Sequence, residues 1–247
     1  MCPTSDALFR KVLVVGGGSG IGRAIALLLN KEGYQVAICG RRRKPLEEVC
    51  RTASGSQGMN LREADVENRS SVRNLFSWFD QEFGELDILI HAAGVNFANR
   101  SLRDLTEKEW DRLININLTG SFNCLKPALE RMRPRKKGIV VLLNSVAGKR
   151  STPLAGIGYN ASKFGMSALG LAAAEEERKN GIRIINIYPG EVNTPILEQR
   201  THPPSENHRK NILQPEDIAE VVANLLTLPD RVHVPELVIK PTLQSYV

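Results

Sequence analysis

The feature that most constrains the fold is a glycine cluster between an apolar run and an amphipathic stretch. Residues 11–15 read KVLVV, residues 20–32 have helical periodicity, and five of the seven residues in 16–22 are glycine. Glycine permits tight turns and lets backbone N–H groups approach a phosphate, and a helix N-terminus adds a positive dipole. A strand, a glycine cluster and a helix in this order predict the first unit of a dinucleotide-binding α/β fold.

Apolar, β-branched runs alternate with amphipathic stretches along the whole chain. Runs of strand type span 11–15, 35–39, 61–65, 86–90, 138–144, 182–188 and 235–241, and helix patterns span 20–32, 45–54, 68–83, 106–132, 158–180 and 215–228. Nearly continuous apolar runs are typical of parallel strands buried on both faces, and the alternation implies right-handed crossovers. We therefore predict one domain over residues 1–247, a Rossmann-type doubly wound parallel β-sheet with helices on both faces.

One long irregular segment interrupts this alternation at 198–214, with the sequence EQRTHPPSENHRKNILQ. Loops of this length in compact domains are more often lids or binding loops than filler, so we expect a substrate loop over 195–214. It could steer or clamp an acidic substrate, or it could be a solvated lid. The basic residues on which the clamp depends are Arg200, His202, His208, Arg209 and Lys210.

Composition limits the class of protein. With 42% hydrophobic and 24% charged residues, the 247-residue chain is typical of a globular protein, and no apolar run is long enough to span a bilayer. Its start, MCPTSDALFRK, lacks the apolar core of a signal peptide. We expect a cytoplasmic protein without a disulfide framework or metal site, because no C-x-x-C spacing joins Cys2, Cys39, Cys50 and Cys124.

A net charge of +6 raises the question of an anionic ligand or a nucleic acid. NAD-binding sites usually carry an acid about 20 residues beyond the glycines, but here Gly40 is followed by Arg41 and Arg42. Guanidinium groups bind a 2′-phosphate, so this pair predicts NADP(H). The basic run at 131–137 is interpreted as a solvated surface. A nucleic-acid-binding module is the less favoured alternative, since aromatic interleaving is missing.

A tyrosine and a lysine lie four residues apart in YNASK, residues 159–163. On a helix this spacing places the phenol of Tyr159 and the ammonium of Lys163 on one face. Ser145 ends a buried strand, and catalytic groups of parallel sheets gather beyond the carboxyl ends of the strands. The helical spacing alone is equally consistent with an aromatic residue that only packs.

Seven motifs in order make the chain resemble the short-chain dehydrogenase/reductase family over nearly its whole length. They are GGGSGIG (16–22), AD (64–65), HAAG (91–94), NLTG (117–120), NSVAG (144–148), YNASK (159–163) and PGEVNTP (189–195). The segment 213–246 is similar to an NADP-dependent branch that oxidises serine and related 3-hydroxy acids. The chain departs from the family pattern at Val15, where a threonine is usual, and at His91 and Ala92, where asparagines are usual. We expect changed hydrogen bonding there.

The resemblance implies a reversible hydride transfer between NADP(H) and an alcohol or carbonyl compound. Tyr159 would be the general acid/base, its pKa lowered by Lys163 and the nicotinamide charge. Ser145 would hold the substrate oxygen and stabilise developing charge. Asn117 would hold a water in a proton relay; its rival Asn115 would face the other way on a helix. A protein that binds NADP(H) as a sensor without turnover is the alternative.

The resemblance also implies the cofactor contacts and an assembly. The pyrophosphate would contact Gly16, Ser19, Gly20, Ile21 and Gly22, and the 2′-phosphate would contact Arg41 and Arg42. The adenine would meet Asp65 and Val66, and the ribose would lie by Gly94, Tyr159 and Lys163. Pro189, Gly190 and Thr194 would lie against the nicotinamide. Family members often form dimers or tetramers through the helices expected at 106–132 and 158–180, and the small residues of 167–174 suit close packing.

Overall fold

The computed structural model describes residues 10–245 and contains one seven-stranded parallel sheet, in the order β3-β2-β1-β4-β5-β6-β7. Cys2 and the N-terminal segment interpreted above lie outside the described residues. The strands are β1 (Lys11–Val15), β2 (Gln35–Gly40), β3 (Asn60–Glu63), β4 (Ile88–His91), β5 (Gly138–Leu143), β6 (Ile182–Pro189) and β7 (Glu236–Ile239). The strand order reverses between β1 and β4, which confirms the predicted doubly wound sheet.

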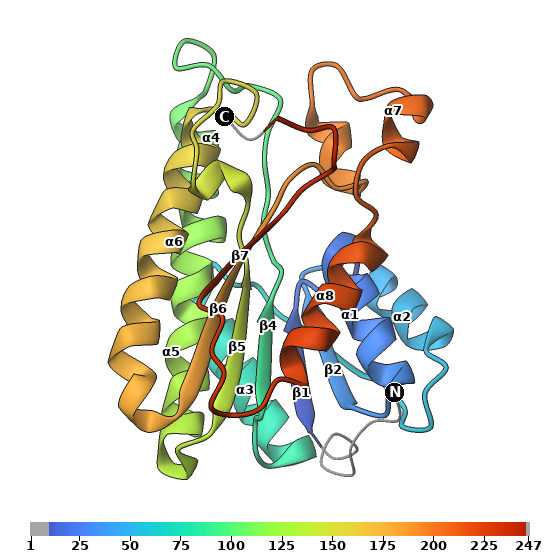
Figure 1. Cartoon of the computed structure of the whole chain (residues 1–247), viewed down its shortest axis with the longest axis vertical. Coiled ribbons are helices and arrows are strands. Elements are labelled where there is room, and N and C mark those ends of the chain that lie inside the picture. The colour runs from blue at the N-terminus through green and yellow to red at the C-terminus, as the bar shows by residue number, and fades with distance from the viewer. Residues whose placement is uncertain (1–9, 246–247) are drawn as a thin grey trace.

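Helices cover both faces of the sheet (Figure 1). One face packs against α1 (Gly20–Lys31), α2 (Arg43–Thr52) and α8 (Pro215–Leu226), and the other against α3 (Arg69–Phe83), α5 (Gly120–Met132) and α6 (Ile157–Glu177). No described helix is long and apolar enough to cross a membrane.

The central strands β1, β4 and β5 are mostly apolar because each one contributes to two cores. In β1, Val12 and Val14 belong to the core beneath α1 and α8, whereas Leu13 and Val15 belong to the core beneath α3, α5 and α6. All four are at most 1% exposed. Alternating residues of a strand point to opposite faces, so a strand covered on both sides shows no polar alternation.

The stretch 106–132, expected to be helical, is helical from Glu107 to Met132, but it is divided into three elements. A capping box between Thr106 and Glu109 begins α4 (Glu107–Leu113), a π-helical segment η2 (Ile114–Thr119) follows, and α5 completes the stretch. Within η2, Asn117 accepts a hydrogen bond from the N–H of Val95 at 2.8 Å and donates one to its carbonyl oxygen at 3.0 Å. These tertiary bonds accompany the widened turn, and helical periodicity could not reveal them.

The segment 195–214 is less irregular than its composition suggests. It contains a 3₁₀-helix, η6 (Pro195–Gln199), and a short helix, α7 (Glu206–Lys210), at whose start Ser205 accepts a hydrogen bond from the N–H of His208 at 3.3 Å. The segment lies at the end of the molecule where the strands have their carboxyl ends (Figure 1).

Candidate active site

A cavity of about 900 Å³ opens at the carboxyl ends of the strands. Residues that follow β1, β2, β4, β5 and β6 line it, and it includes the point where the strand order reverses. All the residues expected to contact the cofactor line this one cavity, namely Gly16, Ser19, Gly20, Ile21, Gly22, Arg41, Arg42, Asp65, Val66, Gly94, Tyr159, Lys163, Pro189, Gly190 and Thr194. Ser145 lines it as well, whereas Asn117 does not.

At Gly16 and Gly22, the glycine-rich turn has no room for a side chain. Gly16 has a φ of +85°, and a Cβ on it would lie 2.6 Å from the backbone nitrogen of Ala93. A Cβ on Gly22 would lie 2.4 Å from the carbonyl oxygen of Gly16. The side chain of Ser19, the N-cap residue of α1, makes no hydrogen bond to the first turn. The turn therefore forms a backbone cradle at a helix N-terminus, which fits a pyrophosphate.

Two exposed arginines stand at the adenine end of the cavity. Arg41 and Arg42 follow β2, and Arg42 is the N-cap residue of α2. The neighbouring Arg43 forms ion pairs with Glu47 at 2.7 Å and Glu63 at 3.9 Å. Within residues 10–245, no carboxylate lies within ion-pair distance of Arg41 or Arg42, so both can receive an anionic group such as a 2′-phosphate.

Ser145 is held at the end of β5 by its neighbour Asn144. The Ser145 N–H donates to Asn144 Oδ1 at 3.0 Å, and Asn144 Nδ2 donates to Ser167 Oγ of α6 at 2.9 Å. Ser145 Oγ accepts from the N–H of Ala147 at 3.1 Å. Sequence reasoning did not assign a role to Asn144, although the NSVAG motif contains it; its signal was a polar residue in the last position of a buried apolar run.

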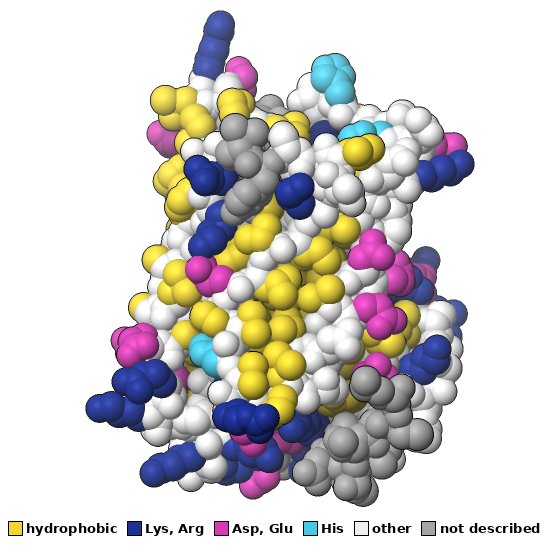
Figure 2. Space-filling model, viewed as in Figure 1, with side chains coloured by type: hydrophobic (Ala, Val, Ile, Leu, Met, Phe, Trp, Pro, Cys, Tyr) yellow, Lys and Arg dark blue, Asp and Glu magenta, His cyan; other side chains and the backbone are white. Residues whose placement is uncertain are grey.

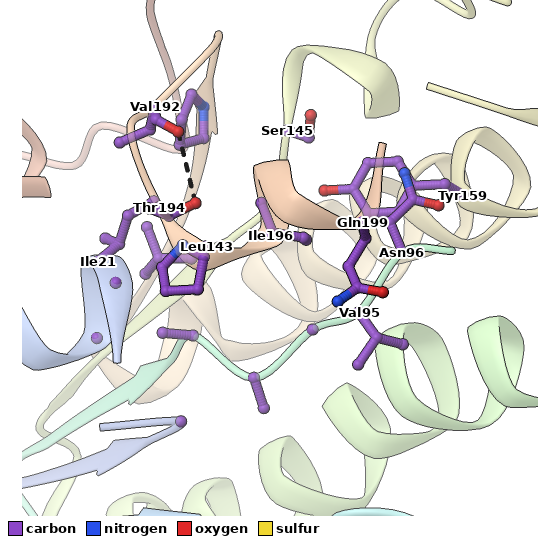
Figure 3. A pocket seen from close by; sticks show the side chains of 18 of the residues that line it. Ile21, Val95, Asn96, Leu143, Ser145, Tyr159, Val192, Thr194, Ile196 and Gln199 are labelled. Carbon is purple, nitrogen blue, oxygen red and sulfur yellow. Dashed lines mark hydrogen bonds between the residues drawn. The ribbon is translucent and has the colours of Figure 1, made fainter. Parts of the chain in front are cut away.

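Tyr159 lies in the first turn of α6, and Figure 3 shows it facing the same space as Ser145. Although the ring is partly exposed, its burial raises the pKa of Tyr159, and this outweighs a hydrogen bond with Ser145 and the charge of Arg100, which both lower it. Lys163 Nζ lies over the phenol ring, 5.7 Å from its centroid. The expected fall in the pKa of Tyr159 includes the charge of a bound nicotinamide, so it stays a prediction for the protein with its cofactor.

Lys163 is 3% exposed and points between α6 and the end of β5. Its Nζ donates to the carbonyl oxygen of Leu143 at 3.0 Å and lies 3.5 Å from Met166 Sδ. Burial lowers the pKa of Lys163 to about 7. Neither contact is a carboxylate, so this ammonium can change its charge state near neutral pH.

Asn117 is fully buried, whereas Asn115 is exposed, so Asn117 packs inside the protein behind the cavity and Asn115 does not. Asn117 Nδ2 donates to Ser162 Oγ at 3.0 Å, and that hydroxyl donates to the carbonyl oxygen of Tyr159 at 2.8 Å. A Cβ on Gly94 would lie 3.4 Å from Asn117 Oδ1 and 3.8 Å from Lys163 Nζ. Asn117 thereby joins the loop after β4 to the helical turn between Tyr159 and Lys163.

His91 is fully buried where the family usually has asparagine. Neither ring nitrogen has a hydrogen-bond partner among the described residues. Burial, and secondly the charge of Lys163, lower the pKa of His91 to about 3, so the ring is neutral. At the end of β4, hydrogen bonds are therefore made by backbone atoms and not by the His91 ring. One example is the N–H of Ala92, which donates to the carbonyl oxygen of Val15 at 2.8 Å.

Three basic side chains of the segment 195–214 contact acids of the same region. Arg200 forms an ion pair with Glu191, and His208 Nε2 lies 2.8 Å from the other carboxylate oxygen of Glu191. Arg209 forms an ion pair with Glu198 at 2.7 Å. Arg200 lines the cavity, but His202, His208, Arg209 and Lys210 do not. The clamp for an acidic substrate stays a prediction, in which Arg200 is the residue placed at the cavity.

Several cavity residues carry no family motif and were missed. The loop after β4 contributes Asn96, Phe97 and Arg100, η6 contributes Gln199, and the end of the chain contributes Gln244. Figure 3 shows Asn96 and Gln199 in the cavity with Tyr159. Opposite them, Thr194 Oγ1 donates to the carbonyl oxygen of Val192 at 3.4 Å (Figure 3).

The sheet topology and the cradle define the class of protein. It is a Rossmann-type α/β protein, whose cavity lies where such folds bind dinucleotides, at the point where the strand order reverses. The family model described as short chain dehydrogenase matches residues 10–205. An uncharacterized oxidoreductase of Staphylococcus aureus strain MW2 is 34% identical over 229 residues, which cover 93% of this chain and 96% of the relative. The chain therefore belongs to the short-chain dehydrogenase family, whose members include curated oxidoreductases.

Solved structures agree with this assignment. An alcohol dehydrogenase from Thermococcus sibiricus, complexed with 5-hydroxy-NADP, has a TM-score of 0.86 at 28% identity and covers 96% of this chain and 98% of its own. A closed form of serine dehydrogenase complexed with NADP⁺ has a TM-score of 0.87 at 25% identity, covering 96% of both chains.

Proposed function

We propose that the protein is an NADP(H)-dependent oxidoreductase that transfers a hydride between the nicotinamide and an alcohol or carbonyl substrate. The observation that carries the proposal is that one cavity joins the glycine cradle and the arginine pair to Ser145, Tyr159 and Lys163. The similar alcohol dehydrogenase and serine dehydrogenase structures contain NADP-type ligands, which supports NADP(H) as the cofactor. Serine is a 3-hydroxy acid, so the second structure is consistent with a 3-hydroxy acid as the substrate.

The residues present fit the proposed cofactor. The backbone cradle of 16–22 would hold the pyrophosphate, Arg41 and Arg42 the 2′-phosphate, and Asp65 and Val66 the adenine. Gly94 and Lys163 would face the ribose, and Pro189, Gly190 and Thr194 the nicotinamide. When bound, the nicotinamide supplies or accepts the hydride, while the protein orients it and supplies the electrostatics.

The catalytic residues would handle the oxygen and its proton. Ser145 Oγ donates to the substrate oxygen and stabilises the negative charge that develops on it. Tyr159 gives its proton to that oxygen in reduction and takes it back in oxidation. Lys163 in its charged form favours the phenolate. Asn117, anchored between Val95 and Ser162, would hold the water that returns the proton.

The test is a spectrophotometric screen at 340 nm, in which NADP⁺ and NAD⁺ are each paired with alcohols, hydroxy acids and amino alcohols. Turnover with a preference for NADP⁺ is the expected result. A preference for NAD⁺ would refute the role of the arginine pair. Tight NADPH binding without turnover of any compound would favour the sensor.

We further infer a cytoplasmic dimer or tetramer. Large apolar side chains are exposed on α4, α5 and α6, namely Trp110, Phe122, Ile157, Phe164 and Leu171. Hydrophobic side chains also gather over β7 and α8 (Figure 2), and Val238 of β7 is 40% exposed. Exposed apolar patches of this kind favour association. Analytical ultracentrifugation tests the assembly, and a monomer at micromolar concentration would contradict it.

A further inference from the structure

Positive charge dominates the end of the cavity where a substrate would meet Tyr159. Arg100, Arg112 and Arg200 line this end. Glu191 lines it too, and it forms an ion pair with Arg200 and a hydrogen bond with His208. Among the described residues, Arg200 thus has an acidic partner here, whereas Arg100 and Arg112 form no ion pair.

Arg100 is the arginine held most directly beside the proposed acid/base. Its carbonyl oxygen accepts a hydrogen bond from the N–H of Ile157, in the first turn of α6, at 3.0 Å. Gly156 has a φ of +88°, and a Cβ there would lie 2.8 Å from the Cβ of Arg100. Because no side chain separates the two segments, Arg100 is fixed close to Tyr159.

The guanidinium of Arg100 is bound only to neutral groups. Its Nε donates to the carbonyl oxygen of Phe97 at 3.0 Å, and its terminal nitrogens donate to the carbonyl oxygens of Leu154 and Gln199. In the described part of the chain, no carboxylate lies within ion-pair distance of it. A half-buried charge without a counter-ion is unfavourable, and a bound anion removes that penalty.

The neighbouring arginines are placed differently. The charge of Arg200 is balanced by Glu191, and the guanidinium of Arg112 lies over the ring of Phe97, 5.7 Å from its centroid. The charge of Arg100 lowers the pKa of Tyr159, and burial and the charge of Arg200 lower the pKa of Arg100 itself. Arg100 is therefore an unbalanced cation within electrostatic reach of the reacting phenol.

We propose that Arg100 anchors a carboxylate of the substrate, so that the enzyme converts oxo acids and the corresponding hydroxy acids. The inference rests on the proposed function and specifies its substrate class. The planar guanidinium of Arg100 can pair with the two oxygens of a carboxylate through parallel N–H···O bonds. In reduction, the carbonyl carbon gains a hydride from NADPH, its oxygen gains a proton from Tyr159, NADP⁺ is released and the carboxylate stays unchanged.

The experiment compares charged and neutral substrates of equal shape. Initial rates of NADPH oxidation are measured with pyruvate, acetoacetate and succinate semialdehyde, each paired with its methyl ester. For the best pair, we expect the wild type to prefer the acid by about 10-fold in kcat/KM. Arg100→Met should lower kcat/KM for that acid by about 100-fold and change it for the ester by less than about 3-fold.

Two further variants separate charge from folding. Arg103→Met removes an exposed arginine three residues away that does not line the cavity, and it should change neither rate. Arg100→Lys keeps the charge without the planar fork and should recover part of the preference for the acid. Circular dichroism and NADPH fluorescence titration confirm that each variant folds and binds the cofactor.

Distinct results refute the two proposals. A wild type that prefers the ester in every pair, or an Arg100→Met variant that loses acid and ester activity equally, overturns the carboxylate anchor and leaves the proposed function standing. A wild type that oxidises NADPH with no compound contradicts the proposed function. Calorimetric titration of malonate onto the NADP⁺-saturated protein then tests whether Arg100 binds a carboxylate. Malonate binding that Arg100→Met abolishes supports the carboxylate anchor. Malonate binding that is absent from the wild type, or unchanged in the variant, overturns it.

Discussion

The glycine-rich turn at 16–22 and the segment 195–214 bound the same cavity, but different forces hold them. In the turn, the backbone packs so closely that a Cβ on Gly22 would lie 2.4 Å from a carbonyl oxygen. In the segment 195–214, side-chain ion pairs such as Arg209 with Glu198 hold the chain, and five of its residues form the short helix α7. The first arrangement tolerates no other residue, whereas the second can be rebuilt with other polar side chains.

Under the proposed function, this difference would separate a part that binds the cofactor, which is the same in every reaction, from a part that contacts the substrate, which varies. A backbone cradle presents N–H groups whose positions do not depend on side-chain rotamers, and it suits a pyrophosphate that every reaction uses. Side chains on loops can vary without disturbing the sheet, so they determine which substrate is accepted. Arg100 lies in a loop, as part of the segment 195–214 does. Its backbone is nevertheless hydrogen-bonded to the start of α6, so its position is fixed by backbone contacts as in the turn.

The largest effect of a substitution on activity is expected at the chemical step, where the cofactor and the substrate would meet. Tyr159→Phe removes the proton donor while it keeps the ring, and kcat should fall by about 1000-fold. NADPH binding, measured by fluorescence titration, should change little, because the cradle is untouched. A variant that keeps more than a tenth of the activity would show that another group transfers the proton.

The next effect breaks the cradle itself. Gly22→Ala places a Cβ against the carbonyl oxygen of Gly16, and we expect the free energy of unfolding to fall by about 3 kcal/mol, with weaker NADPH binding. Gly58→Ala is the matched control, because no atom lies within 4 Å of its added Cβ. Urea denaturation measures both variants; equal stability would contradict the close packing of the turn.

A smaller effect is expected at the arginine pair. The double variant Arg41→Ala, Arg42→Ala loses the two cations proposed for the 2′-phosphate, and KM for NADPH should rise about 30-fold. KM for NADH should stay nearly constant, because that cofactor lacks the phosphate. Arg43→Ala is the control, since the exposed Arg43 is engaged with Glu47. A parallel loss with both cofactors would argue against selection by charge.

The smallest effect concerns pH and the buried ammonium. The pKa of Lys163 is about 7 in the folded protein and about 10.5 in the unfolded chain, so between these values the unfolded chain binds an extra proton. Unfolding free energy therefore rises with pH in this window. From pH 7.5 to 8.5, the wild type should gain about 1 kcal/mol relative to Lys163→Met. Identical pH profiles in urea denaturation would show that this pKa is not lowered.

Local signals predicted the elements well where one short pattern decided the structure. The glycine cluster, the two-sided apolar runs and the helical spacing of Tyr159 and Lys163 depend on neighbouring residues only. The π-helical segment η2 was missed, because Asn117 bonds to Val95, 22 residues earlier in the chain. The ion pair of Arg200 with Glu191 could not be predicted for a similar reason, since composition does not show which side chains of separate segments meet.

The sequence by itself determined the doubly wound sheet, the cradle and the positions of Ser145, Tyr159 and Lys163, because each follows from periodicity or from a backbone need for glycine. Only the tertiary structure decided the charge balance. Burial raises the pKa of Tyr159 and lowers that of Lys163, and these shifts depend on atoms from distant elements. The tertiary structure also places Arg100 beside the phenol, because Gly156 brings two separate segments into contact. Among residues 10–245, no carboxylate lies within ion-pair distance of Arg100.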